Sequence, residues 1–131
     1  MELYFKFTKG SLFLICPKSV VHSFLEKRTF FTQEELHKMT NRQKRDGADY
    51  HITVINRFDM KKVDKVLLSS QMTCFTLEKI HFIGIGKIKT PESSVQFIVV
   101  LSEQLQKLRR NTGLLTVCHF HITLEFTNGD I

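Results

Sequence analysis

A five-residue pattern occurs twice in this chain and limits the folds that the chain can adopt. Residues 50–54 read Tyr-His-Ile-Thr-Val and residues 120–124 read Phe-His-Ile-Thr-Leu, so the two histidines lie 70 positions apart. In a β-strand, residues i and i+2 point to one face, and the residue between them points to the other. Each copy therefore predicts a strand whose apolar side chains enter a core. The imidazole and the hydroxyl would share the opposite face.

The rest of the sequence alternates strand patterns with helix patterns and predicts an α+β domain. Alternating apolar residues indicate strands, and apolar residues at helical spacing indicate helices. We expect strands at residues 3–7, 11–16, 50–55, 79–88, 95–101 and 116–126. We expect helices from Pro17 to about residue 25, from Thr32 to about Met39, over residues 59–68, and between Ser102 and Gly113. Lys9 and Gly10 would form the turn of a first hairpin, and residues 40–48 a basic loop.

Two of these helices carry specific expectations. The helix over residues 59–68 is amphipathic, and its inward side chains would be Met60, Val63, Val66 and Leu67. Ser102 would cap the N-terminus of the later helix. Its last turn holds Lys107, Arg109 and Arg110, which we interpret as helix-terminal charges that complement the helix dipole and not as a binding patch.

Length, charge and cysteine content set outer limits. The chain has 131 residues, which suits one domain over residues 1–131, and a formal charge of +6, which favours an anionic partner. Three widely spaced cysteines without a C-x-x-C motif favour a reducing compartment, the cytoplasm or the nucleus. No segment reads as a membrane span or a signal peptide, and we expect a monomer. The turn signal Asn128-Gly129 leads us to expect a fragment of a longer product.

Two histidines and two threonines around one small anion would suit the cleavage of a phosphodiester. One neutral imidazole would take a proton from the attacking water or hydroxyl, and the other, as imidazolium, would protonate the leaving oxygen. Histidine titrates near neutral pH, so both forms are accessible. The threonine hydroxyls would donate hydrogen bonds to the non-bridging oxygens. This chemistry requires no metal and no cofactor.

In these motifs the chain resembles the 2H phosphoesterase superfamily. The stretches 49–53, 79–86 and 120–126 are most similar to its Swiss-Army-knife-type branch, which is linked to RNA repair. The resemblance implies a bilobal fold, with two antiparallel sheets and flanking helices related by pseudo-twofold symmetry around a central cleft. It also implies metal-independent cleavage of RNA ends or of nucleotide 2′,3′-cyclic phosphates. His51 and His121 match the family's catalytic pair, and Thr53 and Thr123 match its phosphate-binding pair.

Glu125 departs from the family pattern, which often has a glycine directly after the second motif. By alternation Glu125 should share the face of His121, where a carboxylate would repel phosphate or orient another group. The alternative function is therefore a catalytically inactive module that binds phosphate or RNA in the same cleft. A partner-binding piece of a larger protein is a third reading.

Several other residues could contact a substrate. The basic segment with Arg42 and Arg45 leads into the first motif and could steer RNA phosphate toward the cleft, or it could be a solvated loop. Tyr4 and Lys6 lie on the polar face of the first strand and could line the cleft.

The remaining histidines and glycines carry weaker patterns. A zinc site of His119, His121 and a carboxylate is conceivable, but the spacing is a poor match to known zinc motifs. We expect His119 to be solvated, His81 to be structural and His22 to be exposed. The pair Gly84-x-Gly86 lacks the third glycine and the following helix of a dinucleotide-binding motif.

Overall fold

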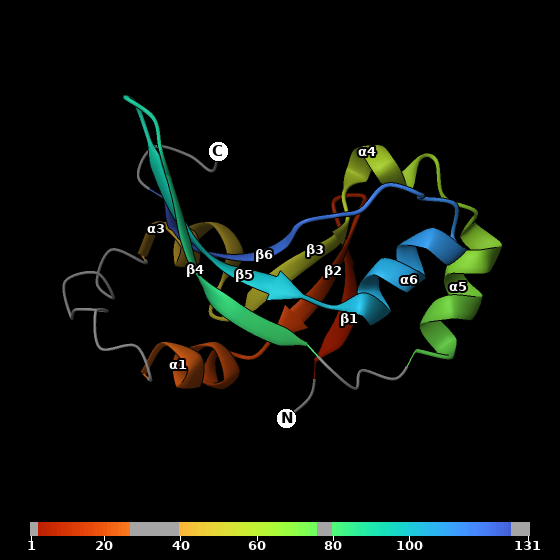
Figure 1. Ribbon diagram of the computed structural model, residues 1–131, viewed down its shortest axis with the longest axis horizontal. Helices are drawn as coiled ribbons and strands as arrows, with labels where there is room; N and C mark the ends of the chain where they lie inside the picture. The colour runs from red at the N-terminus through yellow and green to blue at the C-terminus, as the bar shows by residue number, and fades with distance from the viewer. Residues whose placement is uncertain (1–2, 27–39, 76–79, 127–131) are drawn as a thin grey trace.

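The computed structural model describes residues 3–26, 40–75 and 80–126 and is built around one antiparallel sheet (Figure 1). The six strands follow the order β1-β2-β3-β6-β5-β4. Their bounds are β1 Tyr4–Thr8, β2 Ser11–Cys16, β3 Tyr50–Ile55, β4 His81–Lys89, β5 Ser94–Leu101 and β6 Phe120–Phe126. The helices are α1 Lys18–Glu26, α3 Thr40–Asp46, α4 Arg57–Met60, α5 Lys65–Thr73 and α6 Glu103–Asn111. The prediction of an α+β chain is confirmed.

The two halves of the sheet repeat one order of elements. In each half, a hairpin is followed by a helix and then by a third strand. The first half has this order as β1, β2, α1 and β3, with α3 between α1 and β3, and the second half has it as β4, β5, α6 and β6. The third strands are neighbours at the middle of the sheet, where Ile52 pairs with Ile122. Since this pairing joins the two halves, the described residues form one sheet where two separate sheets were predicted.

Helices α1, α5 and α6 pack on one face of the sheet. Core residues of α1, α5 and α6 join the inward residues of β3 and β6 in a single cluster, which includes Val21, Leu25, Leu68, Leu105, Leu108, Ile52, Val54, Ile122 and Leu124. Figure 1 shows α5 and α6 at the end of the molecule opposite the tip of the long β4–β5 hairpin. Because side chains alternate along a strand, the histidines and threonines of the two motifs belong to the other face.

The first hairpin closes as the sequence predicts. Thr8 pairs with Ser11, and the two residues between them, Lys9 and Gly10, have positive φ values of 51° and 83°. Two positive φ values in a two-residue loop match the right-handed twist of the flanking strands. Glycine adopts this conformation without steric cost.

The helix predicted over residues 59–68 is wrong, because two helices share this segment. Asp64 accepts hydrogen bonds from the main-chain N–H groups of Val66 and Leu67, so it caps a new helix, α5. Val66 and Leu67 then lie in the first turn and are exposed, whereas Leu68 is buried. Met60 and Val63 are buried, as predicted.

Other expectations differ at the ends of elements. The loop predicted over residues 40–48 is wrong, since α3 occupies Thr40–Asp46, and the last strand begins at Phe120, four residues later than predicted. Before it, the Gln106 side chain donates to the main-chain carbonyl of Cys118 and accepts from its N–H, so these groups are not free for a strand partner. The cap at Ser102 is confirmed. The helix predicted from Thr32 to Met39 and the Asn128-Gly129 turn lie outside the described residues.

In the part of the chain that the structure describes, no helix has the length and apolarity needed to cross a membrane.

Candidate active site

The two motifs are neighbours on one face of the sheet. Since β3 and β6 are antiparallel and Ile52 pairs with Ile122, the register sets His51 opposite Thr123 and Thr53 opposite His121. Directly opposite residues have Cβ atoms about 5 Å apart, and diagonal ones about 7–8 Å apart. The four side chains therefore mark the corners of a small rectangle, and each diagonal joins two residues of one type.

His51 is the more enclosed of the two histidines. Its ring stacks on Phe13 of β2, with 4.0 Å between the ring centroids and 14° between the planes. Its Nδ1 lies 4.0 Å from Oδ2 of Asp46, and the side chain is 16% exposed. Burial lowers the pKa of His51 from its ordinary value, with smaller lowering contributions from Arg45, Arg42 and His121, while Asp46 acts in the opposite direction. The neutral imidazole is therefore favoured.

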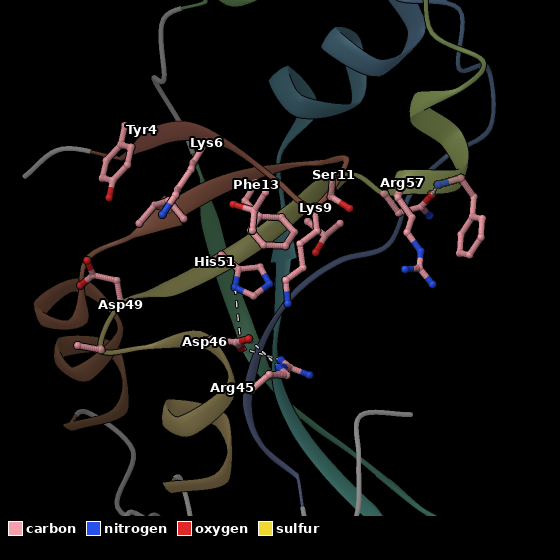
Figure 2. A pocket seen from close by; sticks show the side chains of 16 residues that line it. Tyr4, Lys6, Lys9, Ser11, Phe13, Arg45, Asp46, Asp49, His51 and Arg57 are labelled. Carbon is pink, nitrogen blue, oxygen red and sulfur yellow. Dashed lines mark hydrogen bonds and ion pairs between the residues drawn. The ribbon is translucent and has the colours of Figure 1, made fainter.

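Asp46 connects His51 to Arg45 at the end of α3 (Figure 2). Nε and Nη2 of Arg45 donate to the two carboxylate oxygens of Asp46 at 2.6 and 2.7 Å. The Arg45 guanidinium also lies 4.7 Å from the ring centroid of Phe126. A bidentate arginine fixes the plane of a carboxylate. Asp46 is thereby fixed beside Nδ1 of His51, and Nε2 is the nitrogen on the other side of that ring.

His121 has a different environment. The ring of Phe97 from β5 meets it edge-on, with 5.7 Å between centroids and 69° between planes. The residue is exposed. Its Nδ1 lies 3.5 Å from the main-chain oxygen of His119, at the outer limit of a hydrogen bond. Thr123, two residues later, is buried.

A β-bulge follows the threonine of each motif. Leu12 pairs with Ile55 and Phe13 with Thr53, which leaves Val54 as an extra residue in β3. In β6 the extra residue is Leu124, between the partners of Gln96 and Phe97. Bulges re-aim side chains and interrupt alternation. The residues after them, Ile55 and Glu125, are accordingly both buried.

Glu125 therefore does not follow simple alternation from His121. It is 5% exposed, and it is not among the residues that line the cavity beside His51.

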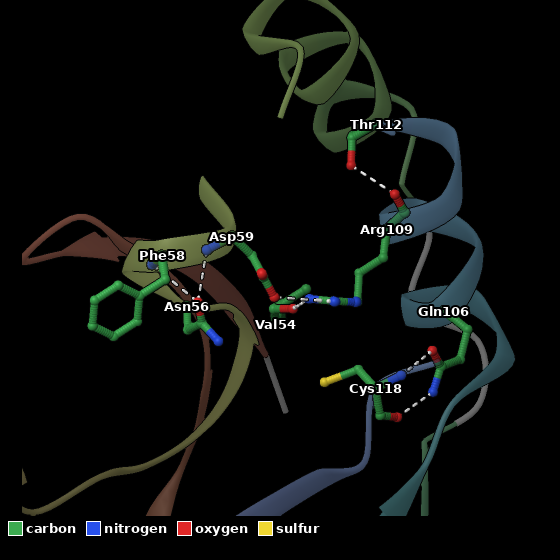
Figure 3. Close-up of polar contacts among 8 residues, drawn as sticks. All are labelled: Val54, Asn56, Phe58, Asp59, Gln106, Arg109, Thr112 and Cys118. Atoms are coloured by element: carbon green, nitrogen blue, oxygen red, sulfur yellow. Dashed lines mark hydrogen bonds and ion pairs between the residues drawn. The ribbon is translucent and has the colours of Figure 1, made fainter. Parts of the chain in front are cut away.

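A buried arginine braces the first bulge (Figure 3). Nη1 of Arg109 on α6 donates to the main-chain carbonyl of Val54 at 2.8 Å, and Nη2 lies 3.4 Å from Oδ2 of Asp59. Arg109 lies in the last turn of α6, as predicted, but its guanidinium is buried because it reaches across the core to β3. Arg110 does pair at the surface, with Glu103.

A cavity of about 680 Å³ extends from His51 across β2 and β1 (Figure 2). Its lining includes Thr53, Phe13, Arg45 and Asp46, together with Tyr4, Lys6, Lys9, Ser11, Asn56, Arg57 and Phe58. The predicted residues Tyr4, Lys6 and Arg45 thus lie around one cavity with the first motif. His121 and Thr123 lie beside it, on the neighbouring strand, and do not line it.

Arg42, which was predicted to contact substrate, is not among the residues that line this cavity. Its guanidinium stacks 3.7 Å from the ring centroid of Tyr50, and Nη1 donates to the main-chain carbonyl of Asp49 at 2.8 Å. Arg42 is buried, and it holds the segment that leads into β3.

The other histidines that the structure describes do not line this cavity. His22 is half-buried, and its Nε2 lies 3.1 Å from the Tyr50 hydroxyl, so the expectation that it is exposed is wrong. His81 and His119 are exposed. In the described residues, no group of three or more histidine, cysteine, aspartate or glutamate side chains could hold a metal ion.

Four side chains that shape the site had no local signal in the sequence. Each of them is far in sequence from the histidine or bulge that it contacts, or lies on another element: Phe13, Phe97, Asp46 and Arg109. Alternation in β2 does put Phe13 on the face opposite Leu12 and Leu14. However, only the strand order reveals that this face is shared with His51.

Comparison with known proteins gives one match. The family model described as "Swiss Army Knife, 2H phosphoesterase domain" matches residues 17–131, a span that contains both His-Ile-Thr motifs. No curated protein and no solved structure matches the chain.

Proposed function

Because the chain belongs to the Swiss Army Knife group of 2H phosphoesterase domains, we propose that it is a metal-independent phosphodiesterase acting on RNA ends or nucleotide 2′,3′-cyclic phosphates. The observation that carries this proposal is the pairing of Ile52 with Ile122, since that register brings both motifs to one face of the sheet. An acid and a base on either side of a phosphorus atom need such a juxtaposition. A phosphoesterase activity follows from the family, whereas the substrate and the roles below are our proposal.

In this mechanism His51 is the general base and His121 the general acid. The lowered pKa of His51 supports its role, because a base must be neutral when the substrate binds. Nε2 of His51 takes a proton from water while the water oxygen bonds to phosphorus. The bond from phosphorus to one ribose oxygen breaks, and that oxygen receives the proton of His121. One water is consumed, and proton exchange with solvent restores both imidazoles.

The threonines and the cations would hold the substrate. The hydroxyls of Thr53 and Thr123 would donate hydrogen bonds to the non-bridging oxygens, on which charge grows in the transition state. Lys6, Lys9 and Arg57 line the cavity and have no carboxylate partner among the described residues, so they would attract neighbouring phosphates. The exposed rings of Tyr4 and Phe58 could stack with bases.

The decisive experiment measures hydrolysis of an oligoribonucleotide that ends in a 2′,3′-cyclic phosphate, in the presence of EDTA. Removing either member of an acid–base pair typically costs about 10²–10⁴-fold in rate. We expect a loss in this range for His51→Ala and for His121→Ala. His81→Ala, an exposed histidine on β4, is the matched control and should keep full activity. Full activity in either of the first two variants would contradict the assignment of the pair.

The alternative is a module that binds the same phosphate without turnover. Saturable binding of the oligonucleotide, with no product from cyclic or linear phosphodiesters, would favour that alternative over the enzyme.

A further inference from the structure

Each histidine of the site contacts a phenylalanine from the adjacent strand. Phe13 on β2 pairs with Thr53, and Phe97 on β5 pairs with Thr123, in both cases directly beside the bulge. The two phenylalanines thus occupy matching positions in the two halves of the sheet. Their contacts nevertheless differ, since Phe13 stacks flat on His51, whereas the rings of Phe97 and His121 meet in a T-shaped arrangement.

The difference coincides with the residue across from each phenylalanine on the outer strand. Phe13 pairs with Lys6 of β1, and Phe97 pairs with Gly86 of β4. A Cβ atom on Gly86 would lie 2.6 Å from both Cε2 and Cζ of Phe97, far inside van der Waals contact. The ring of Phe97 therefore lies over the main chain of Gly86, an arrangement known from aromatic residues that cover glycines on the neighbouring strand.

Gly86 is needed for space and not for backbone conformation. Its φ lies outside the left-handed region, so a side chain would not strain the main chain. Gly84 lies two residues earlier in the same strand, and a Cβ atom there would meet nothing within 4 Å. A glycine inside a strand often marks a close approach of another group, and here that group is the Phe97 ring.

We propose that Gly86 is a positioning residue for His121. With no side chain at this position, Phe97 lies back over β4 and makes only a T-shaped contact with His121, which leaves the imidazole exposed toward a bound substrate. In the other half Lys6 occupies the matching position, and Phe13 lies over His51 and encloses it. The choice of glycine or lysine on the outer strand thus makes the two histidines of a repeated motif unequal. The catalytic consequence rests on the function proposed above, whereas the position of the Phe97 ring over Gly86 does not depend on that function.

The test compares Gly86→Ala with Gly84→Ala. In Gly86→Ala the ring must leave its place over β4, so the ring-current shift of the His121 imidazole protons should change in the NMR spectrum. A displaced acid can cost about 100-fold in rate, so kcat should fall by about 10–100-fold with KM nearly unchanged. Gly84→Ala should match the unmodified protein in both readouts. Equal behaviour of the two variants would overturn the proposal.

A double-variant cycle separates positioning from a general loss of stability. Phe97→Leu removes the ring, so adding Gly86→Ala to it should cause no further loss of kcat, because no ring remains to be displaced. Additive losses would contradict the proposal. If Gly86→Ala alone does not fold, recovery of folding in the double variant would support a clash between the added methyl group and the Phe97 ring. Failure of the double variant to fold would count against the proposal. If the unmodified protein hydrolyses no phosphodiester, the function proposed above fails. The NMR signals of His121 still test whether Gly86 sets the position of the Phe97 ring.

Discussion

His51 and His121 occupy the same place in a repeated motif but meet different side chains. His51 is covered by Phe13 and faces Asp46, whereas His121 is exposed and makes a T-shaped contact with Phe97. Burial disfavours the charged form of an imidazole. At the scale of single residues, this difference lets one imidazole stay neutral beside a partner that meets solvent, as an acid–base pair needs.

The lowered pKa of His51 predicts the pH dependence of the reaction. As the base must be neutral, the acid limb of kcat/KM should lie below the ordinary histidine value of 6.5. The Asp46 carboxylate raises the pKa of His51, so Asp46→Asn should move this limb to still lower pH. Asp49→Asn, at another carboxylate of the same cavity, is the control and should leave the limb in place. A limb that moves upward in Asp46→Asn would refute this account.

Arg109 should contribute more to stability than its neighbour in sequence. Replacing it with Met leaves the buried Val54 carbonyl and the partly exposed Asp59 carboxylate without its donors, and leaving a buried hydrogen-bonding group unpaired typically costs about 1–3 kcal/mol. Arg110→Met removes only a surface pair with Glu103 and should cost less than about 1 kcal/mol. Urea unfolding of both variants gives the two free energies of unfolding. Equal losses would argue against a stabilising role for the hydrogen bond from Arg109 to the Val54 carbonyl of β3.

At the scale of elements, the bulges matter because they come directly after the motifs. Up to Thr53 and Thr123 the strands alternate, and beyond them Ile55 and Glu125 turn inward. Each motif therefore lies at the last regular part of its strand. Arg109 donates a hydrogen bond to the Val54 carbonyl at the first bulge. Helix α6, on one face of the sheet, therefore stabilises the strand geometry behind the motif on the other face.

The cap at Asp64 decides which residues of α5 enter the core. Leu68 is 3% exposed and Val66 is 80% exposed. Leu68→Ala should therefore lower the free energy of unfolding by about 2–5 kcal/mol, while Val66→Ala should change it by less than about 0.5 kcal/mol. Thermal or urea unfolding measures both. If Val66→Ala lowered the free energy of unfolding more than Leu68→Ala, the result would favour the single helix that periodicity alone predicts.

At the scale of the whole molecule, the two halves share one sheet and one core. The core cluster runs from Leu12 and Leu14 in the first half to Ile122 and Leu124 in the second. We expect a single cooperative unfolding transition for this reason. The chain has no tryptophan and two tyrosines, of which Tyr50 is buried in the first half, so tyrosine fluorescence should follow that half. Its urea midpoint should coincide with that of far-ultraviolet circular dichroism, and separate midpoints would mean that the halves unfold independently.

Much of the fold could be predicted because its signals are local. The strands at residues 3–7, 11–16 and 50–55 follow from alternation, the first hairpin from Lys9-Gly10, and the start of α6 from Ser102. The errors arose where a non-local contact or a cap competes with periodicity. Asp64 divides an apparently continuous helix, Gln106 occupies the main chain of Cys118 before β6, and Arg42 enters the core on the ring of Tyr50.

Alternation alone predicts that two strands each present a histidine and a threonine on one face, because the two-residue period is a property of the extended chain. The folded chain sets the pairing of Ile52 with Ile122, and so which residues of the two motifs face each other. It also decided the environment of each histidine, through Phe13 and Asp46 on one side and Phe97 and Gly86 on the other. Strand register and burial are set by residues far apart in the chain, and no local pattern encodes them.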